Sequence, residues 1–390
     1  MWGLESRDMG LSDDLQKLVC DLVAIESVNP DLVAAGSGEG HIADFVAAWL
    51  RGHGLSVEIL EPVPGRKSVI GVLSGNGGGS SLMLNAHMDT VGAGGMADAF
   101  TPVVKDGRIY GRGAYDMKGS LAAIMITARE AAKLGLRGDL IIAAVADEEV
   151  ASIGTNAVLQ RREADAAIVT EPTELRLCLA HKGFAWLEVE AEGVAAHGSR
   201  ADIGVDAIAA IGRILTGIAN LDRRLRNGRG HPLLGRGSVH ASLISGGQEL
   251  STYPASCVVK IERRTIPGED GALALREMKD VIEAAREADP HLVASARLML
   301  ERPPSQLGAD SFVTEAVENA ATECLGRKPE VIGVAYWMDM ALSNAAGIPT
   351  AAFGPSGEGA HADVEWVDLQ SLETCVRVYL RAAELICGTS

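Results

Sequence analysis

The sequence predicts an α/β protein: an α/β/α sandwich with a mostly parallel sheet, plus an inserted α+β domain. Short runs that are apolar at nearly every position recur through the first 170 residues and again near residue 350. Such strands are typical of a sheet covered by helices on both faces. Amphipathic helical segments lie between them. Between residues 182 and 302 apolar and polar positions alternate instead, which indicates strands with one solvent-exposed face.

The predicted sandwich begins with two helices, 12–25 and 39–52, which carry apolar residues at helical spacing. The segment 119–135, "GSLAAIMITAREAAKLG", predicts a further helix that packs on the sheet. The buried strands are expected at 55–60, 81–86, 139–146, 166–170 and 349–353.

The predicted inserted domain has the element order β-α-β-β-α-β. This order is typical of the split βαβ (ferredoxin-like) arrangement, in which two helices cover one face of a four-stranded antiparallel sheet. The domain boundaries are therefore expected at 1–181 and 303–390 for the two parts of the catalytic domain and at 182–302 for the insertion. The elements of the insertion are expected at 187–192, 204–225, 238–245, 256–266, 271–288 and 292–300.

Composition excludes several classes of partner. The chain has 390 residues and a formal net charge of −17, which argues against nucleic acid or an anionic membrane as a partner. The first residues contain no cationic segment followed by an apolar one, and no apolar run approaches the length that spans a bilayer. We therefore expect a cytoplasmic protein. The six cysteines form no C-x-x-C pair, so neither a zinc knuckle nor a disulfide framework is indicated.

Polar residues capable of binding a metal follow the predicted strands. "LMLNAHMDTVGAGG" (82–95) ends a strand with His87 and Asp89, "DEE" (147–149) follows the next strand, and Glu171 follows a third. In open α/β sheets, ligands bind at these carboxyl ends of the strands. Two glycine-rich segments, "GRGAYDMKG" (111–119) and "GPSGEGAHADVEW" (354–366), add Asp116 and His361.

So many carboxylates and histidines on one rim would repel each other unless cations neutralised them. Imidazole, Asp and Glu without a thiolate favour zinc or a similar divalent ion in a catalytic site. The number of ligands fits two ions better than one, about 3.5–4 Å apart with a bridging Asp. Asp89 is expected to accept a hydrogen bond from the outer nitrogen of His87 and so to orient the imidazole.

Each motif alone has a simpler interpretation. An H-x-D at a strand end is more often a surface turn, and "DEE" is usually a solvated acidic loop. Their combination, in this order and at successive strand ends, favours the metal site.

The same residues resemble the dizinc M20 peptidase family, which includes acetylornithine deacetylases, succinyl-diaminopimelate desuccinylases, glutamate-releasing carboxypeptidases and dipeptidases. The resemblance runs nearly end to end. Its six motifs appear in order as His87–Asp89, Gly111–Gly119, Asp147–Glu149, Glu171–Thr173, His181–Gly183 and Gly359–His361.

The resemblance implies a role for each site residue. Asp116 would bridge two divalent metal ions, most simply Zn, with Co or Mn as substitutes. His87 and Glu171 would complete one ion's shell, and Glu149 and His361 the other's. Glu148 would be the general base, with Asp89 beside it as a further catalytic residue.

The resemblance also extends to the inserted domain, which the family uses as a lid and for dimerisation, so a homodimer is expected. His197, in "VAAHGSRADIG", would reach the partner's active site and stabilise the oxyanion. Arg264 would bind a substrate carboxylate, and Ser251 and Gly359 are the other expected substrate contacts. Ser251 replaces an Asn found in many relatives, which leaves the substrate open.

The predicted activity is hydrolysis of an amide by a dimetal-activated water, with an N-acyl amino acid or a short peptide as the small-molecule substrate. The segments "GPSGEGAH" and "HGSRADIG" resemble the acetylornithine deacetylase and desuccinylase branch of the family, and this resemblance favours a deacylase. A carboxypeptidase or dipeptidase of the same family is the alternative, and a non-catalytic metal-binding homologue is the rival from another class. No G-x-S-x-G or H-E-x-x-H motif occurs, which argues against other hydrolase classes.

Overall fold

The computed structural model describes residues 5–389. Their contacts divide the chain into two compact units, which we describe separately. The first unit spans Met1–Leu179, Leu307–Ile332 and Met338–Ser390, and the second spans Ala180–Gln306 and Gly333–Trp337. No helix among the described residues is both long and apolar enough to cross a bilayer.

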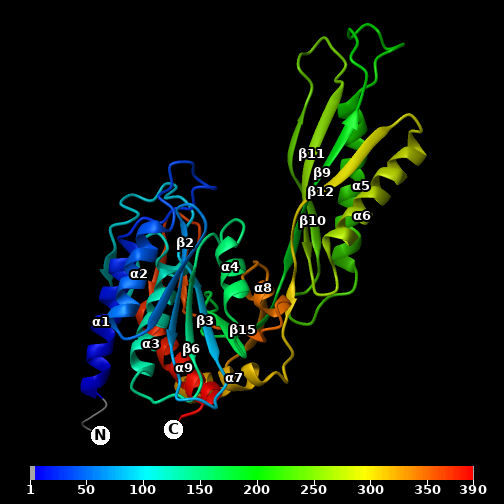
Figure 1. The fold of residues 1–390 in the computed structure, drawn as a ribbon. Coiled ribbons are helices and arrows are strands. Elements are labelled where there is room, and N and C mark those ends of the chain that lie inside the picture. Colours follow the sequence, from blue (N-terminus) through cyan, green and yellow to red (C-terminus); the bar gives the residue numbers. More distant parts are fainter. Residues whose placement is uncertain (1–4, 390) are drawn as a thin grey trace. The chain divides into compact units, whose positions relative to one another are not determined.

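The strands at the centre of the first unit belong to a mixed nine-stranded sheet, some of whose end strands include residues of the second unit (Figure 1). Its central strands run parallel, in the order β6-β3-β7-β15, and antiparallel strands extend the sheet at both ends. Every residue of β3, β6 and β7 is buried, as expected for apolar strands covered on both faces. The strands are β1 (Ser56–Val63), β2 (Arg66–Leu73), β6 (Leu140–Val145), β3 (Leu82–His87), β7 (Ala166–Val169), β15 (Thr350–Ala352), β8 (Leu177–His181) and β13 (Ser305–Gln306), with β14 (Val331–Val334) paired to β8.

Helices cover both faces of this sheet (Figure 1). Val158 of α4 packs with Ile70, Met83 and Ile141 on one face. On the other face, Leu50 of α2 lies against Gly71 of β2, and α1, α3 and α9 pack together. The helices are α1 (Glu5–Val23), α2 (Gly40–Gly52), α3 (Gly119–Ala131), α4 (Ile153–Arg161), α7 (Phe312–Leu325), α8 (Met340–Ala345) and α9 (Leu369–Cys387).

A small antiparallel sheet that the sequence did not predict joins distant segments of the first unit. It has the order β16-β17-β5-β4. The segment between β5 and α3 carries Asp116, and the segment between β16 and β17 carries His361. The small sheet therefore holds the two glycine-rich segments next to each other. Its strands are β4 (Val103–Lys105), β5 (Arg108–Tyr110), β16 (Gly357–Glu358) and β17 (Trp366–Asp368).

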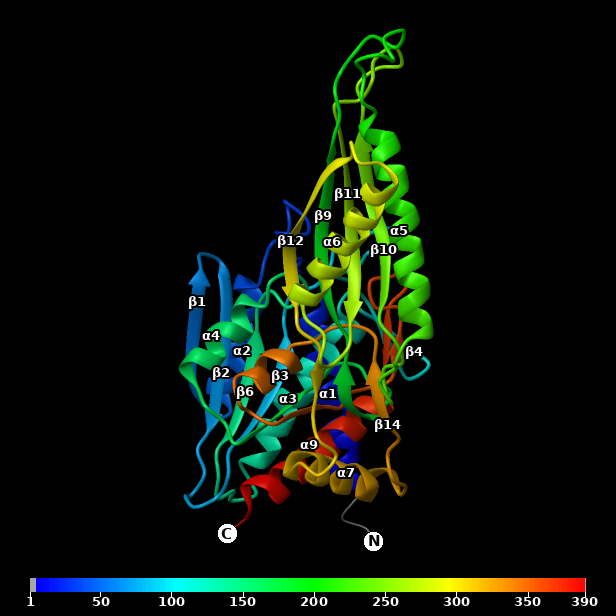
Figure 2. The same ribbon diagram turned by 90° about the vertical axis from the view of Figure 1, so that its right-hand side faces the viewer.

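The second unit has the predicted β-α-β-β-α-β order. Its antiparallel sheet has the strand order β10-β11-β9-β12 (Figure 2), and both helices lie on one face (Figure 1). Residues alternate between buried and exposed along β9 and β11, and the buried ones pack against the helices. The elements are β9 (Gly183–Glu192), α5 (Ala207–Asn227), β10 (Ser238–Gly246), β11 (Ser256–Thr265), α6 (Gly271–Ala288) and β12 (Val293–Arg302).

Capping residues explain where several helices begin. Helix α5 starts at Ala207 rather than at residue 204, because the Asp206 carboxylate accepts a hydrogen bond from the Ala209 amide at 3.0 Å. Asp270 caps α6 in the same way, and that helix has the predicted bounds. Helix α1 begins at Glu5, earlier than the predicted start at residue 12.

Candidate active site

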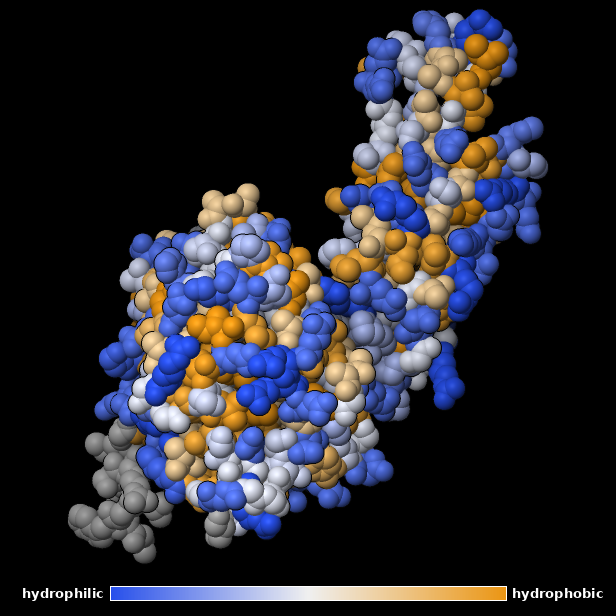
Figure 3. All heavy atoms as spheres, in the orientation of Figure 1, coloured by the Kyte–Doolittle hydropathy of each residue, from blue (hydrophilic) through white to orange (hydrophobic). Residues whose placement is uncertain are grey.

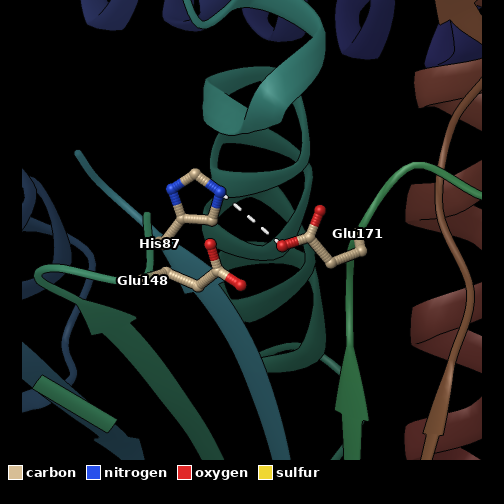
Figure 4. A group of neighbouring side chains, drawn as sticks. All are labelled: His87, Glu148 and Glu171. Atoms are coloured by element: carbon tan, nitrogen blue, oxygen red, sulfur yellow. Dashed lines mark ion pairs between the residues drawn. The ribbon is translucent and has the colours of Figure 1, made fainter. Parts of the chain in front are cut away.

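Three of the predicted site residues, two metal ligands and the general base, meet where parallel strands end. β3 pairs in parallel with β6 on one side and β7 on the other, so their carboxyl ends lie at one edge of the sheet. His87 is the last residue of β3, Glu148 follows β6, and Glu171 follows β7. Figure 4 shows the three side chains pointing toward one another, and their ligand atoms lie within 4.8 Å of each other.

His87 is buried and lies among carboxylates. Its Nε2 is 3.0 Å from an oxygen of Asp116 and 3.6 Å from an oxygen of Glu171. Its Nδ1 lies 3.0 Å from the backbone oxygen of Asp89 and 3.6 Å from the Asp89 carboxylate. The backbone carbonyl of Asp89, more than its side chain, therefore orients the ring.

Asp116 lies between the two histidines of the site. Its Oδ1 faces Nε2 of His87, and its Oδ2 lies 3.3 Å from Nε2 of His361. The same nitrogen of His361 is 3.1 Å from Glu149. His87, Asp116 and Glu149 form a second group whose ligand atoms lie within 4.8 Å of each other. The two groups share His87, and the two oxygens of Asp116 face different histidines.

The acidic side chains disturb each other's protonation. Burial, followed by repulsion from Glu171, raises the pKa of Glu148 well above its usual 4.5. Burial and the nearby Asp116 raise the pKa of Glu171 in the same way. Hydrogen bonds to Asp116 and Glu149 raise the pKa of His361 to about 10. This setting therefore favours the neutral form of the buried Glu148 and Glu171 and the charged form of the more exposed His361.

This set of donors fits divalent cations. Each imidazole nitrogen that faces a carboxylate carries, in the neutral ring, a lone pair that could coordinate a cation. A cation would also relieve the repulsion among the carboxylates. Nitrogen and carboxylate ligands without a thiolate suit zinc, and also cobalt or manganese.

Glu365, which the sequence analysis did not single out, holds the segment that carries Asp116. Its buried carboxylate accepts hydrogen bonds from the amides of Gly113, Tyr115 and Asp116 at 2.9–3.1 Å. It also accepts one from the Arg112 guanidinium at 2.7 Å. Asp116 and Glu365 are 249 positions apart in the sequence, which explains why no local pattern could have revealed this contact.

The segment that carries His361 requires glycine at position 359. Gly359 has a φ of +87°, and a Cβ atom there would lie 1.8 Å from the backbone oxygen of Val364. His361 itself adopts a φ of +62°. Gly359 thus permits the tight turn that presents His361, which is the role the geometry supports for this residue.

The other predicted site residues belong to the second unit. His197 and Ser251 lie on neighbouring segments: the Gly198 amide donates to the Ser251 carbonyl at 2.6 Å, and His197 bridges to Thr252. The His197 side chain is exposed, and its Nδ1 lies 2.8 Å from the hydroxyl of Ser199. Arg264, on β11, is one-third exposed and pairs with Glu262 at 2.7 Å.

Comparison with known proteins finds relatives among deacetylases and peptidases. The chain is 29% identical over 361 residues to acetylornithine deacetylase from Myxococcus xanthus, covering 89% of this chain and 92% of that protein. A tripeptidase from Staphylococcus aureus superposes with a TM-score of 0.80 at 19% identity, over 96% of this chain and 98% of that chain. A dinuclear metal-binding M20 peptidase from Bacillus subtilis gives 0.76 at 18% identity, over 98% and 100%.

The model of peptidase family M20/M25/M40 matches residues 83–385, which include every metal-binding candidate described above. The match spans most of the chain and both units. The chain therefore belongs to peptidase family M20/M25/M40 and is a hydrolase of amide bonds.

Proposed function

We propose that this protein removes the acyl group from an N-acyl amino acid in a reaction that depends on two divalent metal ions. The observation that carries the proposal is the position of Asp116 between His87 and His361, with three further carboxylates in reach. The similarity to acetylornithine deacetylase over nearly the full length of both chains supports the deacylase branch.

The proposed ligands are those that the family resemblance implies, and the contacts among them support this choice. Asp116 would bridge the ions, since its two oxygens face different histidines. His87 and Glu171 would complete one shell, and Glu149 and His361 the other. Zinc suits these donors best, and cobalt or manganese could replace it.

Two bound cations would supply a water with a pKa lowered toward neutrality and would polarise the carbonyl of the substrate. Glu148 accepts a proton from the attacking water and returns it to the departing amine. Its carboxylate is suited to this because it points into the same space as His87 and Glu171 (Figure 4). Asp89 holds the loop of Glu148 by accepting its amide hydrogen at 3.1 Å.

We assign the recognition of substrate to the second unit. His197 would stabilise the oxyanion of the tetrahedral intermediate in the partner subunit, a contribution of about 3 kcal/mol to the barrier. Arg264 would bind the free carboxylate of the amino acid, and Ser251 would contact the acyl amino acid near His197. Kinetics of Arg264→Ala on free acids and their esters test this, because only the free acids should lose activity.

A homodimer would place His197 in trans. The second unit exposes apolar residues on its surface (Figure 3), and Leu243 and Ile244 on the edge strand β10 are 64% and 56% exposed. An edge strand with exposed apolar side chains can pair with the same strand of a second copy. Leu243→Lys should convert a dimer to a monomer in sedimentation. Active heterodimers of His197→Ala and Glu148→Ala subunits would support the role in trans, and inactive ones would refute it.

The test of the reaction itself has two steps. First, the zinc- or cobalt-loaded enzyme is incubated with a panel of N-acyl amino acids and dipeptides, and products are identified by mass spectrometry. Second, Glu148→Ala is compared with the wild type: it should bind the same amount of metal and lose turnover. A fully active Glu148→Ala enzyme would refute the assignment of the general base.

Cleavage of a short peptide, as a carboxypeptidase or dipeptidase, is the second candidate function. The family membership supports it equally, because both reactions break one amide bond and differ in what the pocket admits on either side. Turnover of dipeptides with no turnover of N-acyl amino acids would select this alternative. Metal binding without turnover on the whole panel would favour a non-catalytic homologue.

A further inference from the structure

A buried hydrogen-bond network lies behind the candidate metal site in the first unit. Its central member is Arg66, at the start of β2, which is only 5% exposed. The guanidinium binds both oxygens of Glu39 at 2.7 and 2.9 Å and Asp147 at 2.7 Å. A fourth bond, at 2.6 Å, reaches the exposed Asp31. None of these residues except Asp147 belongs to a motif discussed above.

Asn29 connects this network to the site. It is fully buried, and its side-chain amide donates to Asp89 at 2.8 Å and to Asp147 at 2.9 Å. The orientation of the amide group is fixed because its oxygen accepts the Asp31 backbone hydrogen at 3.0 Å. One residue therefore joins two carboxylates that would otherwise repel each other.

Both carboxylates control the loop that carries Glu148 and Glu149. Asp89 accepts the amide hydrogens of Glu148 and Glu149 at 3.1 and 3.3 Å. Asp147 directly precedes them and has a φ of +69°, a conformation that costs free energy in a residue other than glycine. The direction in which the two glutamates leave β6 thus depends on Asp147 remaining in this conformation.

We propose that Asn29 and Arg66 are positioning residues that fix the 147–149 loop for catalysis. Neither has a hydrogen bond to a proposed metal ligand or to the general base through its own side chain. They act through Asp89 and Asp147, which they hold from the interior of the unit. The inference rests on the proposed function, because it takes the rigid loop to place the general base, Glu148, and one metal ligand, Glu149.

Asn29→Ala is the first test, because each of its two carboxylate partners keeps another donor: Arg66 for Asp147, and backbone amides for Asp89. We expect kcat, or the affinity for one of two Co²⁺ ions, to fall by roughly 10- to 100-fold. KM should stay within about twofold, since no contact with substrate is removed. Binding of Co²⁺ is measured by calorimetry and kcat by hydrolysis of the best N-acyl amino acid.

Arg66→Lys and Arg66→Met form a second pair. Lys keeps the charge but not the forked geometry, so it should retain more of the Co²⁺ affinity than Met. If Arg66→Met does not fold, Asn29→Ala decides the question alone. Lys67→Gln is the matched control: Lys67 neighbours Arg66 in β2 but pairs with Asp44, and its loss should change neither kcat nor Co²⁺ binding.

Val158→Ala serves as a control for general loss of stability, because it removes buried volume from α4 in the same unit. Wild-type kcat and Co²⁺ affinities in Asn29→Ala, or losses no larger than those of Val158→Ala at the same fall in Tm, would overturn the proposal. If the wild type binds Co²⁺ but hydrolyses no substrate in the panel, the proposed function fails, and the Co²⁺ affinities still decide the role of Asn29.

Discussion

His181 offers a quantitative test of the structure through the pH dependence of stability. It is fully buried in the second unit, where its Nδ1 donates to the Lys182 carbonyl at 3.0 Å and its Nε2 has no hydrogen-bond partner. Trp337 packs against the ring edge-to-face, with 6.1 Å between centroids. This desolvated setting lowers the pKa of His181 from 6.5 to about 4.

The sign of the effect follows from proton linkage. Below pH 6.5 the unfolded chain takes up a proton at His181, and the folded chain does not until about pH 4. Stability is therefore lost as pH falls through this window, and none is lost above it. With these two pKa values, protonation of His181 lowers the free energy of unfolding by about 2 kcal/mol between pH 7 and pH 5.

Wild type and His181→Phe are unfolded with urea in the presence of EDTA at pH 7 and at pH 5. Circular dichroism monitors the unfolding. Phe keeps the ring and loses the Nδ1–H donor, a cost of about 1 kcal/mol at both pH values. The stability of the wild type relative to the variant should thus fall by about 2 kcal/mol on acidification. Other titrating groups cancel in this comparison. An unchanged difference at the two pH values would refute the buried, neutral state of His181.

Three further outcomes follow from the site. Glu365→Gln should reduce Co²⁺ affinity roughly 10- to 100-fold in calorimetry, because the segment of Asp116 loses a charged acceptor; wild-type affinity would contradict this. Gly359→Ala should abolish turnover and lower Tm, because its Cβ would collide with Val364, whereas Gly107→Ala, with φ +73° and open space, should cost only its backbone strain. Removal of metal with EDTA should lower Tm, and Zn²⁺ at 100 times its Kd should raise the free energy of unfolding by about 2.7 kcal/mol. A Tm that changes with neither treatment would count against a metal bound by the folded state.

Local patterns predicted the parts of the fold that depend on burial. The strands that end at His87 and Val145 are apolar at nearly every position, and only burial on both faces tolerates such runs. β2, "RKSVIGVL", escaped prediction because it begins with two cationic residues, although Arg66 is buried by its carboxylate partners. Among the other strands at the ends of the central sheet, β1 was predicted at 55–60, whereas β8, β13 and β14, which have two to five residues each, were not.

The candidate site also contains residues that the sequence predicted and residues that it did not. Residues at the ends of strands were accessible to prediction because topology alone brings those ends together. The residues that hold the loops in place were not, since Glu365, Arg66 and Asn29 act on segments far away along the chain. In isolation each is an ordinary polar residue, and only the folded contacts reveal its partner.

The most direct test of the proposed two-metal site is a crystal structure of the zinc-loaded enzyme with anomalous data at the zinc edge. We predict two anomalous peaks, one on each side of Asp116, the first beside His87 and Glu171 and the second beside Glu149 and His361. A single peak, or zinc bound away from Asp116, would contradict this prediction.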